Sequence, residues 1–123
     1  MKIDVLGTEL ELKYDITDAA DAEKLEAALD EFSKGLNEIE KEKGIRQSQL
    51  IRKEVACAKA CLDEVCGEGA GEKVFADKED LKTVYVVSYI LRNLNRLYMS
   101  DVLTDALKDA LEQYSPERAQ RKK

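Results

Sequence analysis

The chain has 123 residues, of which 37% are charged and 44% hydrophobic. This length and composition suit one folded domain with a single core, and they exclude a largely disordered chain. The net charge is −6, and because residues 117–123 carry four cations against one anion, the rest of the chain carries −9, which disfavours nucleic acid and anionic membranes as partners.

Nothing in the sequence predicts export or membrane insertion. Asp4 follows closely on Met1, so the N-terminus lacks the apolar segment of a signal peptide. The longest apolar run, Val84 to Leu91, is much shorter than a helix that spans a bilayer. The three cysteines, an odd number, also argue against a disulfide framework. We therefore expect a cytoplasmic protein.

The first elements along the chain are two short strands. Over about residues 2–15, apolar side chains alternate with polar ones, which is the period of a half-buried strand. Gly7–Thr8 separates the two runs and supplies turn-forming residues. The pattern predicts a β-hairpin whose apolar face packs on another element, because an isolated hairpin is only marginally stable.

Two amphipathic helices are predicted next, over about residues 18–43 and 47–66. Each has an apolar seam with alternating spacings of three and four residues. The seams consist of Ala22, Leu25, Leu29, Phe32, Leu36 and Ile39 in the first helix and of Ile51, Val55, Ala58, Leu62 and Val65 in the second. Gly44 is expected to end the first helix, and the glycine-rich segment 67–71 to end the second in a flexible loop.

Two further helices are predicted over about residues 78–99 and 101–114, or else one long helix with a bend near residues 99–101. Asp77 is the expected cap of the first of these helices. Apolar residues cover much of its circumference, so we expect it to be the central and most buried element.

Ser115–Pro116 is expected to end the ordered chain, because the residue before a proline disfavours helix. Residues 117–123 would then form a basic, flexible tail. Together these elements predict a mainly α fold, in which residues 1–116 form one domain. Its architecture is expected to be a bundle of three to four helices with an N-terminal β-hairpin.

The sequence offers little machinery for catalysis or for binding a metal or a nucleotide. It contains no histidine, the usual proton shuttle near neutral pH and a common metal ligand. Cys57, Cys61 and Cys66 lack a CxxC spacing and a fourth ligand, so they are expected to be small buried hydrophobic residues. The glycine-rich segment 67–73 lacks the spacing of a phosphate-binding loop. We predict a non-enzymatic protein without cofactor or metal.

Protein binding is therefore the expected function. Tyr85 and Tyr89 widen the apolar surface of the predicted helix 78–99, and Arg92 and Arg96 lie four residues apart beside them. These four residues are the predicted partner-binding surface. The surplus apolar surface of this helix serves either the folding of the monomer or self-association, and the sequence leaves both open.

Two parts of the sequence resemble a known group of proteins. One part, Glu64–Lys78, reads EVCGEG and, two residues later, EKVFADK. The other combines IDVLGTE at Ile3–Glu9 with KYDIT at Lys13–Thr17. Over about residues 3–80 the chain resembles small proteins encoded in the tail gene clusters of Gram-positive phages and prophages.

The resemblance implies a chaperone-like role in phage or prophage tail assembly in the cytoplasm of the bacterial host cell. The implied partner is the tail tube or the tape-measure protein. The family has no assigned catalytic residues, so none are implied for this chain. One alternative is a self-associating structural helical protein, a homo-oligomer without a chaperone role. The other is a thiol or metal-binding protein that uses its three cysteines.

Overall fold

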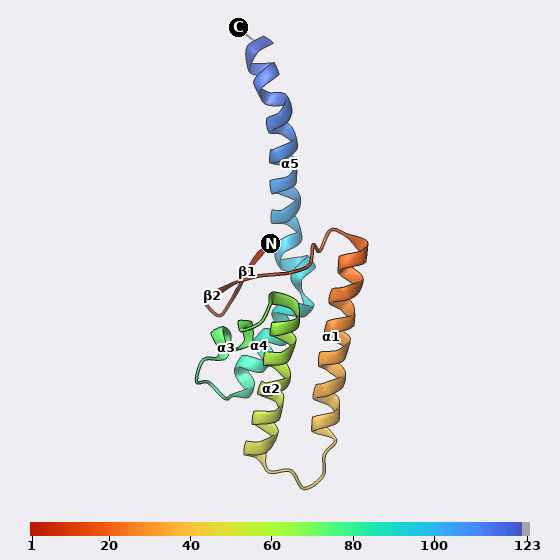
Figure 1. Ribbon diagram of the computed structural model, residues 1–123, viewed down its shortest axis with the longest axis vertical. Helices are drawn as coiled ribbons and strands as arrows, with labels where there is room; N and C mark the ends of the chain where they lie inside the picture. Colours follow the sequence, from red (N-terminus) through yellow and green to blue (C-terminus); the bar gives the residue numbers. More distant parts are fainter. Residues whose placement is uncertain (122–123) are drawn as a thin grey trace.

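The computed structural model describes residues 1–121, and the side chains of residues 1–113 (Figure 1). The described elements are β1 (Lys2–Val5), β2 (Thr8–Glu11), α1 (Ala19–Glu40), α2 (Gln47–Cys66), α3 (Ala70–Phe75), α4 (Leu81–Arg92) and α5 (Leu94–Arg121). The predicted mainly α fold with an N-terminal β-hairpin is confirmed, with one helix more than the four that the sequence predicted.

The N-terminal hairpin lies between the end of α2 and the beginning of α5 (Figure 1). Its strands are antiparallel, and the turn lies at Leu6–Gly7, one residue earlier than the predicted Gly7–Thr8. Both turn residues have positive φ, the conformation of the tight turn that best matches the twist of two paired strands. The backbone N–H of Lys13 donates to the Val65 carbonyl at 2.8 Å, which ties the hairpin to α2.

Helix α2 is the centre of the molecule. It has the predicted bounds, and it packs against α1, α3 and α4. Its core residues Val55, Ala58, Leu62 and Val65 are almost completely buried. The expectation that the helix after the glycine-rich segment would be central is therefore wrong, because α4 covers only one side of α2.

The glycine-rich segment is an ordered part of the core, which corrects the prediction of a flexible loop. Helix α3 begins at Ala70, and the Gly71 N–H donates to the Asp63 carboxylate at 2.8 Å. A Cβ atom at Gly71 would lie 2.7 Å from the Cα atom of Lys59. Glycine is therefore needed here because the backbones of α2 and α3 are in contact.

The boundary between the last two helices differs from the prediction. Helix α4 is capped by Asp80, three residues after the predicted Asp77, and the Asp80 carboxylate accepts from the Thr83 N–H at 2.7 Å. The break to α5 lies at Asn93, not at residues 99–101, and the Asn93 amide donates to the Tyr89 carbonyl at 2.7 Å. The apolar pattern runs on past this break, so it gave no signal of it.

Helix α5 packs on the body only at its beginning. Leu94 is buried, and the Tyr98 hydroxyl accepts from the Asp4 N–H at 2.9 Å. Residues 103–113 are all exposed, and this part of the helix stands away from the rest of the molecule (Figure 1).

The predicted end of the chain at Ser115–Pro116 is wrong, because the backbone of α5 is helical to Arg121. A proline lacks the N–H that would donate within the helix, but the neighbouring backbone hydrogen bonds can continue the helix on either side. Flexibility of the segment 117–123 stays a prediction, and residues 122–123 lie outside the described part of the chain.

Phe75 offers a direct test of this core, because its side chain is completely buried beside α2. We expect Phe75→Ala to lower the free energy of unfolding by about 3–5 kcal/mol, since it removes buried area and leaves a cavity. Tyr85→Ala is the matched control, because Tyr85 is 62% exposed, and it should change stability by less than about 0.5 kcal/mol. Urea unfolding measures both; equal losses would contradict the described packing.

Candidate functional site

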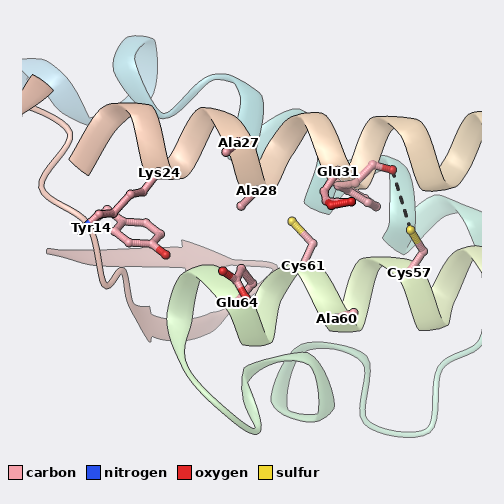
Figure 2. Close-up of a pocket in the computed structure, with 10 residues that line it drawn as sticks. Tyr14, Lys24, Ala27, Ala28, Glu31, Cys57, Ala60, Cys61 and Glu64 are labelled. Carbon is pink, nitrogen blue, oxygen red and sulfur yellow. Dashed lines mark hydrogen bonds between the residues drawn. The ribbon is translucent and has the colours of Figure 1, made fainter. Parts of the chain in front are cut away.

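A pocket of about 680 Å³ lies between α1 and α2 (Figure 2). It is lined by Tyr14, by Lys24, Ala27, Ala28, Glu31 and Phe32 of α1, and by Cys57, Ala60, Cys61 and Glu64 of α2. The lining covers eight residue steps on α1, which is about 12 Å of helix, so the pocket is elongated along the two helices. We call it the α1–α2 pocket.

The pocket exists because small side chains face each other across the helix pair. Ala28 on α1 and Cys61 on α2 point toward each other across the helix pair (Figure 2), and Ala27 and Ala60 also line the pocket. The helices come close at one end, where a Cβ atom on Gly35 would lie 2.8 Å from the Cys57 sulfur. The alanines therefore leave an apolar hollow that opens to the surface.

Charged groups at this pocket are not paired with one another. Lys24 and Glu31 lie on α1, and Glu64 lies on α2. None of the three forms an ion pair within the part of the chain that the structure describes. Their charges are therefore available to a molecule that enters the pocket.

The thiols of the α1–α2 pocket are poor nucleophiles. Burial raises the pKa of Cys61 to about 12, and it also raises the pKa of Cys57. Outside the pocket, burial raises the pKa of Cys66 to about 11. The described residues contain no group of three or more Cys, Asp and Glu side chains placed to hold a metal ion. The raised pKa values disfavour a role for these thiols as nucleophiles.

We expect all three thiols to react slowly with a disulfide reagent at pH 8 while the protein is folded. Their raised pKa values keep the reactive thiolate scarce, so the rate should be at least about tenfold below that of the urea-unfolded chain. Added zinc should change neither rate. Fast reaction of the native thiols would contradict the described burial. Protection of the thiols by zinc would instead support the metal-binding alternative.

Glu54 of α2 is the one acidic residue that is buried in the described side chains, with 2% of its surface exposed. Burial raises its pKa, and the charge of Glu40 adds to the effect. Because the folded pKa lies above the ordinary value of 4.5, the contribution to stability is present below pH 4.5 and is lost as the pH rises through the folded value. The charged form therefore destabilises the fold at neutral pH.

Glu54→Gln should consequently raise the Tm by a few degrees at pH 7, and the gain should vanish below pH 4.5, where Glu54 is protonated in both states. Glu64→Gln is the control on the same helix, and because Glu64 is exposed it should leave the Tm almost unchanged. Thermal unfolding across this pH range tests the effect; a lower Tm for Glu54→Gln at pH 7 would contradict it.

The structure brings together only part of the predicted partner surface. Arg96 of α5 donates a hydrogen bond to the Tyr89 hydroxyl of α4, and its guanidinium carbon lies 5.6 Å from the ring centre. Tyr85 is exposed on the same helix as Tyr89. Arg92 donates instead to the Ser33 hydroxyl of α1, so it belongs to a different part of the surface. That these residues bind a partner stays a prediction.

A larger exposed surface lies on α5, within the predicted helix 101–114. We define the α5 face as Val102, Leu103, Ala106, Leu107, Ala110 and Leu111. At 3.6 residues per turn these positions cover about half of the helix circumference. Leu103 is 53% exposed, Leu107 59% and Leu111 42%. The spacing of these leucines indicates that they share one side of the helix, but it does not indicate that this side is exposed.

The described fold is that of a small, mainly α protein with an N-terminal hairpin, an open pocket and an exposed apolar helix face. Residues 7–123 match a family of unknown function (DUF6673), and because the match covers nearly the whole chain, the chain belongs to this family. No curated protein and no solved structure matches the chain. Among residues 1–121, no helix has the length and apolarity needed to cross a membrane.

Proposed function

We propose that this protein is a non-enzymatic protein-binding domain with a chaperone-like role in phage or prophage tail assembly. In this proposal an amphipathic helix of the tail tube or tape-measure protein packs against the α5 face. The single observation that carries the binding function is the exposure of Leu103 and Leu107 on a helix that extends from the body.

Exposed leucines in a row are a costly feature for a protein that acts alone. Each buried leucine side chain is worth about 1.5–3 kcal/mol relative to an exposed one. Contiguous exposed apolar surface rimmed by charge is typical of protein interaction sites. The charged residues Asp101, Asp105, Lys108 and Asp109 lie on the other half of the helix circumference, so the helix has the amphipathic form that partner helices recognise.

The assignment to tail assembly has a separate support, namely the resemblance of residues 3–80 to proteins of phage tail gene clusters. The acidic chain is compatible with a protein partner and disfavours nucleic acid. The absence of histidine from the sequence and the raised pKa values of the thiols favour binding over catalysis.

The double variant Leu103→Gln/Leu107→Gln should weaken binding to the purified partner by at least about a hundredfold, the loss expected for two leucines that no longer become buried. Both positions are exposed, so the fold should be retained. Thr104→Gln, between them and outside the α5 face, is the matched control and should bind like the wild type. Calorimetry with tail tube and tape-measure proteins measures the affinities; no binding by the wild type, or equal binding by the double variant, would refute the proposal.

A further inference from the structure

We propose that two copies of this chain exchange their α5 helices, so that residues 101–109 of each copy fill the α1–α2 pocket of the other. The inference rests on the proposed function in one respect, because both use the α5 face as a contact surface. It names the α5 helix of a second copy as the occupant of the α1–α2 pocket. The observations behind it are that Leu103 and Leu107 are exposed on α5 and that the α1–α2 pocket is open.

The two surfaces are similar in length. The α1 side of the pocket runs from Lys24 to Phe32, which is eight residue steps or about 12 Å of helix. The α5 face runs from Val102 to Leu111, which is nine residue steps or about 14 Å of helix. A helix that lies along the pocket with this face toward it is therefore long enough to fill it.

The two surfaces also agree in shape. Ala27, Ala28 and Ala60 are small residues of the pocket, whereas Leu103 and Leu107 are large residues of the α5 face. Packing of large side chains from one helix into hollows between residues of its neighbours is how helices associate in bundles. The inserted helix would add a third helix to the α1–α2 pair and bury both leucines.

Charge fixes the direction of the inserted helix. On α1, Lys24 and Glu31 are seven residues apart, which is two turns, so they lie on one side of the helix. On α5, Asp101 and Lys108 have the same spacing with the opposite order of charge. If α5 lies parallel to α1, Asp101 can pair with Lys24 and, two turns further along, Lys108 can pair with Glu31.

These four charges are available for such pairing. None of them forms an ion pair with another residue in the described part of the chain. An antiparallel helix would place Lys108 near Lys24 and Asp101 near Glu31 in the same register. The parallel direction is therefore the favoured one.

The parallel direction has a consequence for symmetry. Within one copy, α1 and α5 run in opposite directions (Figure 1). A helix that lies parallel to α1 must therefore come from a copy that is inverted relative to the first. When a two-fold axis relates the two inverted copies, each gives its α5 helix and each receives one, and the assembly closes as a dimer.

Two variants separate the helix from the pocket. Leu103→Gln/Leu107→Gln disables the inserted helix, and Ala60→Arg blocks the pocket with a long charged side chain at an exposed position. Ala56→Arg is the matched control, because Ala56 is also exposed on α2 but does not line the pocket. Circular dichroism checks that each variant is folded, and light scattering or sedimentation gives the masses.

We expect the wild type and Ala56→Arg to reach twice the monomer mass of 13.9 kDa with rising concentration, while the other two variants stay monomeric. A mixture of the two monomeric variants should give a weaker heterodimer, since one intact helix then meets one intact pocket. A monomeric wild type would overturn the inference. So would a dimeric Ala60→Arg variant, which would indicate direct pairing of α5 helices or another contact.

A charge exchange tests the proposed direction. Lys24→Asp should weaken the dimer about threefold to tenfold, because it replaces two exposed ion pairs by like charges. Adding Asp101→Lys in the same chain should restore the affinity, and failure to restore it would overturn the parallel arrangement.

The tail partner distinguishes the two proposals. If the wild type is monomeric but binds that partner through Leu103 and Leu107, only the exchange fails. If it dimerises but binds no partner, only the proposed function fails.

Discussion

The structure depends on the burial of α2. This helix packs against α1, α3 and α4, and the hairpin is fastened to its end by the hydrogen bond between Lys13 and Val65. Once these elements surround α2, the core is complete, and α5 contributes to it mainly through its first turns. The rest of α5 leaves the body and extends away from α1 and α2 (Figure 1). An exposed apolar face on one helix and an unfilled hollow beside another follow from this one arrangement.

Much of the fold could be predicted, because the hairpin, α1 and α2 follow the local rules of periodicity and capping. The predicted range of α2, about residues 47–66, agrees with the observed bounds. Helix α1 is capped by Asp18 but ends at Glu40, three residues before the predicted end and ahead of Gly44. Helix α3 was not predicted because a cluster of glycines favours a loop. Gly71 is required for a different reason, namely the close contact of its backbone with Lys59, which the sequence does not show. The break at Asn93 was missed because its only sign was a polar side chain that caps α4.

The binding surfaces could be predicted only in part. The sequence indicated that Leu103 and Leu107 share one side of a helix, but exposure depends on whether another element covers them, which is a tertiary property. The α1–α2 pocket depends on which residues of the two helices line the same space, and the packing of α1 on α2 decides this. Conversely, the spacing of Arg92 and Arg96 predicts that they are neighbours on one helix. The break between α4 and α5 separates them, and Arg92 donates to Ser33 whereas Arg96 donates to Tyr89.

The most direct measurement is hydrogen–deuterium exchange at low and at high protein concentration. At low concentration the amides of residues 103–113 should exchange fast, because the side chains of this part of α5 are exposed. At high concentration, or with the tail partner, residues 101–109 should become protected, and in the dimer residues 24–32 of α1 should become protected with them. Slow exchange of residues 103–113 at all concentrations, or no change on adding either partner, would contradict the role of the α5 face.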